Sequence, residues 1–63
     1  MKVFDLGEKA IYQFRVEIPF EKESLLSDVQ EWIIANKISG AILPRIAFFS
    51  KYEDVILFIL RWS

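Results

Sequence analysis

The chain contains no cysteine and no histidine among its 63 residues. Without cysteine it forms no disulfides, and without both residues a structural zinc site is not expected. The missing histidine also removes the commonest general base and the usual activator of a serine nucleophile. Glycine and proline number two each, so the chain has no glycine-rich phosphate loop. We therefore expect no catalytic residues, no metal and no cofactor.

The chain also lacks an excess of charge and a long hydrophobic run. Eight Lys and Arg face nine Asp and Glu, which gives a net charge of -1. Non-specific nucleic-acid binders are usually far more basic, so nucleic acid is a disfavoured partner. The longest apolar run is six residues, whereas about 20 are needed to cross a bilayer. The acidic Asp5 lies in the region where a secretory signal carries basic and apolar residues. We therefore expect a cytoplasmic protein without a membrane segment.

What the chain does have is apolar residues, which make up 54% of it. A chain of 63 residues is one domain, expected over residues 1–63, and it buries only about 60% of its unfolded surface. Small folds of this kind are often stabilised by disulfides, a metal or oligomerisation. Because the first two are not expected here, the composition favours association with a partner.

The apolar pattern predicts an α+β fold with one helix on a mainly antiparallel sheet of three to four strands, in the order ββαββ. Clean alternation over residues 10–18 is typical of a half-buried strand. A strand over residues 1–6 would bring the number of strands from three to four. The two remaining strands are expected over residues 45–50 and 55–62, with a turn at 51–54 between them.

The helix is expected over residues 25–38. At about 100° per residue an apolar stripe forms from Leu25, Leu26, Val29, Trp32 and Ile33. Two isoleucines, Ile34 and Ile38, project away from this stripe and suggest a second contact surface. Gly40 is expected to end the helix. Trp32 is interpreted as a core residue, whereas Trp62 fits either the core or a ligand contact.

The run of six apolar residues, 55–60, carries the main functional argument. A strand alternates its side chains between two faces, so a strand of this composition is apolar on both. We assign one face of the last hairpin to the core: Ile46, Phe48, Ile56, Phe58, Leu60 and Trp62. One residue of slip in the hairpin would exchange the two faces. The other face is left without a helix to cover it.

That uncovered face brings arginines together with apolar side chains, a combination enriched at protein interfaces. The predicted interface comprises Arg15, Ile34, Ile38, Arg45, Phe49, Val55, Leu57, Ile59 and Arg61. Arginines beside hydrophobic strands also serve as gatekeepers against aggregation, so both interpretations stay open.

Acidic residues give weaker signals. Glu21, Glu23 and Asp28 fall near the expected helix start, where acids favour the helix dipole, so no metal site is inferred. Glu53 and Asp54 fall in the expected turn, where Asp is common.

The sequence therefore predicts a non-enzymatic protein–protein interaction module. It would form a homodimer, or dock on a larger protein as an adaptor or a steric inhibitor, such as a phage or mobile element carries. The alternative is a sheet that binds single-stranded nucleic acid through Arg15, Arg45, Arg61 and Phe49. An enzyme or ligand carrier would need a site built between subunits.

Overall fold

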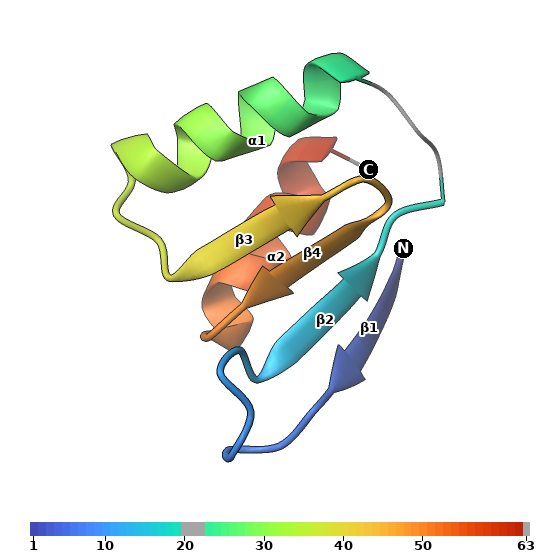
Figure 1. The fold of residues 1–63 in the computed structure, drawn as a ribbon, viewed down its shortest axis with the longest axis vertical. Coiled ribbons are helices and arrows are strands. Elements are labelled where there is room, and N and C mark those ends of the chain that lie inside the picture. The colour runs from blue at the N-terminus through green and yellow to red at the C-terminus, as the bar shows by residue number, and fades with distance from the viewer. Residues whose placement is uncertain (20–22, 63) are drawn as a thin grey trace.

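A computed structural model describes residues 1–19 and 23–62, without the side chain of Glu23. Its elements run β1 (Lys2–Asp5), β2 (Phe14–Glu17), α1 (Glu23–Ala35), β3 (Gly40–Leu43), β4 (Ile46–Phe49) and α2 (Tyr52–Trp62) (Figure 1). The four strands form one antiparallel sheet in the order β1-β2-β4-β3. The fold is α+β with an antiparallel sheet, as predicted, and the segment at residues 1–6 does supply a strand. The prediction of a single helix was wrong, because the chain ends in a second one.

The six-residue apolar run belongs to α2 and not to a strand, which overturns the expectation for residues 55–62. Val55, Phe58, Ile59 and Trp62 recur at the spacing of one helical face and pack in or against the core. The expected turn at 51–54 is the start of this helix, where the Lys51 carbonyl accepts the Val55 amide at 3.4 Å. Acidic residues in the first turn and Arg61 in the last suit the helix dipole.

The hairpin of β3 and β4 also differs from the prediction. Leu43 pairs with Ile46, so Pro44 and Arg45 form a two-residue turn. Arg45 has a φ of 72°, the left-handed conformation that a type II turn requires after its proline. Gly40 begins β3 rather than ending the helix. A Cβ at Gly40 would lie 2.6 Å from the Phe48 carbonyl oxygen and 2.9 Å from the Phe49 ring, so this close approach needs glycine.

Helix α1 ends at Ala35, three residues before its predicted end. The Ile38 amide donates to the Ile33 carbonyl at 3.0 Å, and the Lys37 amide donates to the Ile34 carbonyl at 3.3 Å. These two bonds define a Schellman motif, which needs a left-handed residue after the helix. Lys37 takes that position with a φ of 52°. The motif turns Ile38 back against the core.

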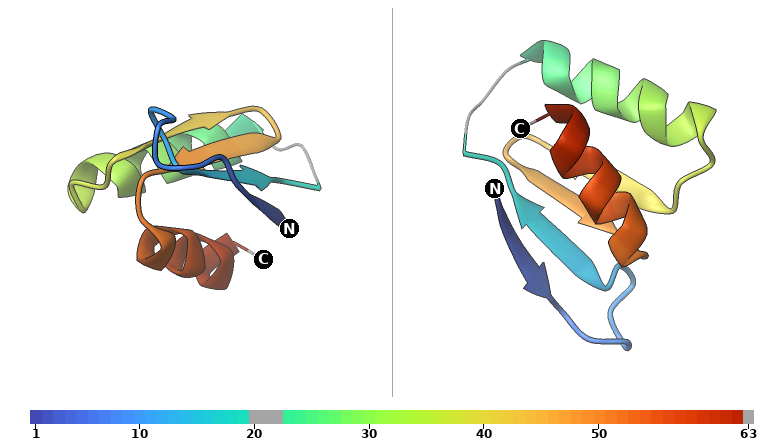
Figure 2. Two further views of the ribbon diagram at one scale, coloured as in Figure 1. Left: turned by 90° about the horizontal axis from the view of Figure 1, so that it is seen from below. Right: turned by 180° about the vertical axis from the view of Figure 1, so that it is seen from behind.

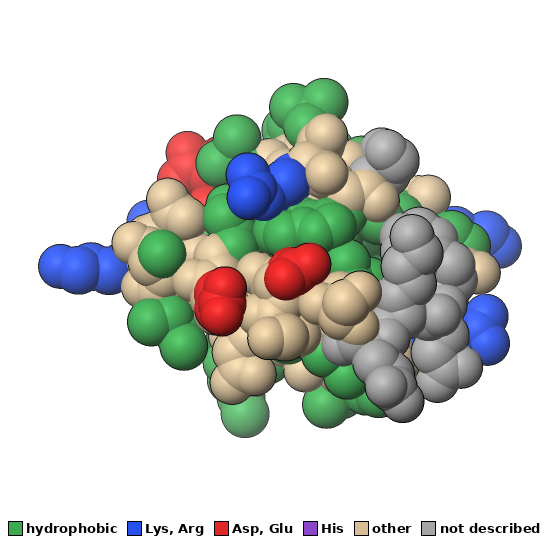
Figure 3. Space-filling model, turned by 90° about the horizontal axis from the view of Figure 1, so that it is seen from above, with side chains coloured by type: hydrophobic (Ala, Val, Ile, Leu, Met, Phe, Trp, Pro, Cys, Tyr) green, Lys and Arg blue, Asp and Glu red, His purple; other side chains and the backbone are tan. Residues whose placement is uncertain are grey.

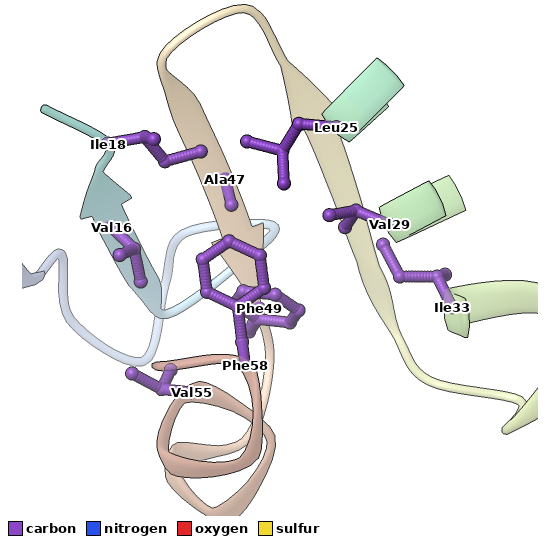
Figure 4. Packing of buried hydrophobic residues seen from close by; sticks show 9 residues of the cluster. All are labelled: Val16, Ile18, Leu25, Val29, Ile33, Ala47, Phe49, Val55 and Phe58. Atoms are coloured by element: carbon purple, nitrogen blue, oxygen red, sulfur yellow. The ribbon is translucent and has the colours of Figure 1, made fainter. Parts of the chain in front are cut away.

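The core lies between the sheet and the two helices, and four elements contribute to it (Figure 4). Its buried side chains are Val16, Ile18, Leu25, Val29, Ile33, Ala47, Phe49, Val55 and Phe58. Strand β4 buries Ala47 and Phe49 fully, whereas Ile46 and Phe48 are half-buried. The predicted assignment of Ile46 and Phe48 to the core beneath the helix was therefore wrong. The hairpin whose register the prediction left open does not form, because residues 52–62 are helical and β4 pairs with β2 and β3.

The two helices leave one broad face of the sheet without a covering helix. Helix α2 lies behind the sheet, where it contacts β2 and β4, and α1 runs along the edge formed by β3 (Figure 2). The side chains of α1 and α2 meet at Trp32, whose ring centroid lies 6.3 Å from that of Phe58. In the described part of the chain, the face turned toward the viewer in Figure 1 is crossed by no helix.

Candidate interaction surface

The nine residues of the predicted interface do not lie together. Phe49 and Val55 are core residues, 0% and 1% exposed, so their placement on an uncovered face was wrong. Ile38 and Ile59 are partly buried against the same core. The structure disperses the rest: Arg15 lies in β2, Arg45 in the β3–β4 turn, Ile34 on α1, and Leu57 and Arg61 on α2. The error comes from the strand assigned to residues 55–62, since a helix distributes the same side chains around its axis.

The sheet register defines the uncovered face, because residues paired between neighbouring strands point to the same side. Arg15 pairs with both Phe4 and Phe48, and Phe48 pairs with Ala41. We call this set of paired residues, with the alternate positions on the same side, the open face. Its members are Lys2, Phe4, Arg15, Glu17, Ala41, Leu43, Ile46 and Phe48.

Aromatic rings and one cation are held in contact on the open face. Tyr12 stacks on Phe48 with ring centroids 6.1 Å apart and an interplanar angle of 28°. The Arg15 guanidinium lies over the Phe4 ring, 5.7 Å from its centroid. Arg15 also makes the one ion pair among the described residues, to Glu17 at 3.7 Å. Since this pair is well exposed, it contributes little to stability.

The β1–β2 connection bends over the open face (Figure 2). Its side chains line a shallow groove together with residues of β3 and β4. The groove has a volume of about 400 Å³. Every residue that lines it is apolar: Leu6, Ala10, Ile11, Tyr12, Ala41, Leu43 and Phe48. Ile11 stands at its rim with 90% of its surface exposed, and Leu43 is about half exposed. We call this feature the apolar groove.

The groove was not predicted from the sequence, although part of its signal was present there. Residues 10–18 were predicted to be one continuous strand, but only Phe14–Glu17 pair as β2. The preceding residues turn out of the sheet, with Asp5 Oδ1 accepting from the Gly7 amide at 2.9 Å and the Leu6 amide donating to Gln13 at 2.7 Å. Gly7 has a φ of 92°, which glycine adopts without strain. The glycine at position 7 therefore indicated a turn, but no local sequence pattern indicated that Tyr12 stacks on Phe48.

A second hollow lies between the two helices. It has a volume of about 710 Å³ and its lining includes Trp32, Trp62, Arg61, Asp28 and Glu31. The two tryptophan rings meet edge to face at 5.2 Å, and the Arg61 guanidinium lies 5.1 Å from the Trp62 ring centroid. Figure 3 shows this side of the molecule, where hydrophobic side chains separate a basic side chain from two acidic ones. The tryptophans join the two helices, so their first role is structural.

The acidic residues noted in the sequence do not form a metal site in the described part of the chain. No three acidic side chains converge there. Glu21 and the side chain of Glu23 lie outside what the structure describes. Glu53 and Asp54 occupy the first turn of α2, where their charge suits the helix N-terminus. Neither helix of the described ranges 1–19 and 23–62 has the length and apolar character needed to span a membrane.

Comparisons with protein-family models, with curated proteins and with solved structures found no significant match to this chain. Inference about function therefore depends on the surfaces of the molecule itself.

Proposed function

We propose that this protein is a non-enzymatic interaction module that binds a partner protein through its open face. One observation carries the proposal: both helices serve the back and one edge of the sheet, while the front presents a groove lined only by apolar residues. A soluble monomer rarely leaves a continuous apolar patch of this kind in water unless it serves binding. The role is that of an adaptor or a steric inhibitor.

The composition of the open face supports a protein as the partner. Aromatic side chains and arginine are enriched where proteins meet, and this face offers Phe4, Tyr12, Phe48 and Arg15. Each large apolar side chain that a partner removes from water contributes about 1.5–3 kcal/mol before the costs of association. Ile11 and Leu43, the most exposed residues of the groove, have the most to gain from such a cover.

The proposal is tested by capturing the partner with immobilised protein and then reconstituting the complex from purified components. Ile11→Ser and Leu43→Asp alter the groove, and both residues are exposed, so the fold should survive. Ile34→Ser is the matched control, since Ile34 is an exposed isoleucine on α1 that does not line the groove. We expect the wild-type protein and the control to bind the purified partner with equal Kd, and the groove variants to bind at least about tenfold more weakly.

A partner that binds all four proteins with the same Kd would exclude the open face as its site. Failure of the wild-type protein to retain any partner would remove the proposal itself. The non-enzymatic character and the cytoplasmic location stay predictions from the sequence.

A specific observation also favours a second candidate, a sheet that binds single-stranded nucleic acid. Aromatic rings on an open antiparallel sheet are platforms for base stacking. Phe4 and Phe48 lie on this sheet, and Tyr12 of the β1–β2 connection stacks on Phe48. Two carriers named from the sequence do not fit, because Phe49 is in the core and Arg61 is on α2. The Phe4 ring is already covered by Arg15, and the net charge of -1 opposes phosphate binding.

Fluorescence anisotropy with mixed-sequence oligonucleotides distinguishes this candidate from the first. Binding at low salt that weakens as salt rises, and that is lost in Phe48→Ala, would support nucleic acid as the ligand. No change in anisotropy at low salt would exclude it.

A further inference from the structure

Helix α2 is apolar almost all round, although only one side of it faces the core. Val55 and Phe58 are buried beneath it, but the outer side carries Tyr52, Ile56, Leu57 and Leu60, all exposed. Leu60 is 75% exposed and Leu57 is 53% exposed. A helix that is hydrophobic on all sides is normally buried on all sides. In the described part of the chain the outer side of α2 has no cover.

The charged residues of the same outer side are placed symmetrically. Glu53, Leu57 and Arg61 follow one another at intervals of four residues, so they form a row along the helix. The row has an acid at one end, leucine in the middle and a base at the other end. Glu53 and Arg61 are about 12 Å apart along the axis, since each residue rises about 1.5 Å. In an antiparallel copy of the row, a base therefore lies opposite each acid and an acid opposite each base. The row is complementary to itself.

We propose that α2 is a self-association surface whose occupant is α2 of a second copy of this chain. The two helices run antiparallel around a two-fold axis near Leu57. That axis places Glu53 of each copy beside Arg61 of the other, and it brings the exposed apolar residues of both helices together. Isologous contact around a two-fold axis is the commonest arrangement of homodimers. A parallel arrangement would instead place like charges together.

The position of α2 on the molecule suits this pairing. The helix stands on the back of the sheet, on one of the two broad sides of a molecule with extents of 31 × 24 × 18 Å (Figure 2). The open face lies on the opposite side of the sheet, so the dimer would display two open faces outward. The pairing of α2 does not depend on the function proposed for the open face.

Arg61 has a competing environment within its own chain, and the test must separate the two. Its guanidinium lies over the Trp62 ring, and it lines the hollow that also includes Asp28 and Glu31. Both acidic residues belong to α1. If Arg61 acted only toward α1, a change at Glu53 would leave self-association unaltered.

The test is a charge exchange followed by sedimentation equilibrium over a concentration series. We expect Glu53→Arg and Arg61→Glu each to weaken the dimer about tenfold, because either change places like charges together at both ends of the pair. The double variant E53R/R61E should return the dimer Kd to within about threefold of the wild type. An effect of the helix dipole alone would give a different result. The double variant has both charges at the unfavourable ends of α2, so its free energy of unfolding would be the lowest of the four proteins.

Substitutions of apolar residues test the same surface without changing the pair of Glu53 and Arg61. Leu57→Asp and Leu60→Asp should each weaken the dimer at least about a hundredfold, because a two-fold interface would bury two unpaired carboxylates. Ile34→Asp on α1 is the control and should leave the dimer Kd unchanged, since Ile34 is also exposed but lies on the other helix. Circular dichroism verifies that each variant retains its helices.

Three outcomes would overturn the proposal. The first is a wild-type chain that sediments as a monomer up to millimolar concentration. The second is a dimer that Leu57→Asp and Leu60→Asp leave intact, which would assign association to another surface. The third is a double variant that associates no better than the single variants. That result would mean that Glu53 and Arg61 do not pair between two copies, as expected if α2 docked on a different protein.

Discussion

The two faces of the sheet differ sharply, although one strand supplies both with similar side chains. In β4, Ala47 and Phe49 are fully buried on the covered face, whereas Ile46 and Phe48 are half-buried on the open face. The difference comes from α2, which lies behind the sheet and contacts β2 and β4 there. Two adjacent phenylalanines, Phe48 and Phe49, therefore have different roles. Phe49 holds the fold together, and Phe48 forms the floor of the apolar groove.

Apolar content alone therefore does not define a core. A side chain becomes part of the core when a second layer reaches it, and the chain has only enough helix for one side of the sheet. The aromatic contacts show where that layer acts: Phe49 lies 5.3 Å from Phe58 and 6.3 Å from Trp32. Phe48 meets only Tyr12 among the aromatic rings of the described residues. Variants at neighbouring positions can measure this asymmetry.

The largest effect is expected for Phe49→Ala. Truncating a fully buried phenylalanine leaves a cavity between the sheet and both helices, and should cost about 3–5 kcal/mol of the free energy of unfolding. For so small a domain this is most of its stability. Urea denaturation followed by circular dichroism measures the change. A loss below about 1 kcal/mol would contradict the placement of Phe49 in the core.

Adding a methyl group to the covered face should also destabilise the protein. In Gly40→Ala the new Cβ meets the Phe48 carbonyl oxygen and the Phe49 ring, so β3 must shift. We expect a loss of about 1–3 kcal/mol in the free energy of unfolding, measured by the same denaturation. Gly7→Ala is the control for steric contact, since nothing lies within 4 Å of its Cβ and any loss there arises from its left-handed backbone.

A smaller effect is expected for Phe48→Ala, the counterpart of Phe49→Ala on the open face. The substitution removes the stacking with Tyr12 but leaves the packing beneath α2 intact, so it should cost about 1 kcal/mol. Thermal unfolding of the two variants side by side gives the comparison directly. Equal losses from Phe48→Ala and Phe49→Ala would show that the two faces are equally packed, and would contradict an open face.

The smallest effect is expected for Leu43→Ser at the end of β3. Leu43 is about half exposed on the groove, so the change in the free energy of unfolding should stay within about 0.5 kcal/mol. Its effect on partner binding should be larger than its effect on stability. A variant that unfolds as readily as Phe49→Ala would show that the groove belongs to the core.

The sequence by itself determined the elements whose patterns have one interpretation. The apolar stripe of residues 25–33 could only serve an amphipathic helix, and it does so in α1. Alternation over residues 10–18 predicted a strand, and the part of it at Phe14–Glu17 forms β2. The lack of cysteine and histidine is also a property of the sequence alone, whatever fold the chain adopts.

Tertiary structure decided the conformation of the apolar run near the end of the chain and the position of the candidate interaction surface. Six apolar residues in a row satisfy a strand and a buried helix equally well, because local periodicity is hidden when every position is apolar. In the structure this segment is a helix whose Val55 and Phe58 pack in the core, where α2 contacts the neighbouring β4 and also β2, which is distant in sequence. The register of β4 follows from the same contacts, and with it the face on which Phe48 lies. The candidate surface is therefore a property of long-range packing, which the sequence could show only as a surplus of apolar residues.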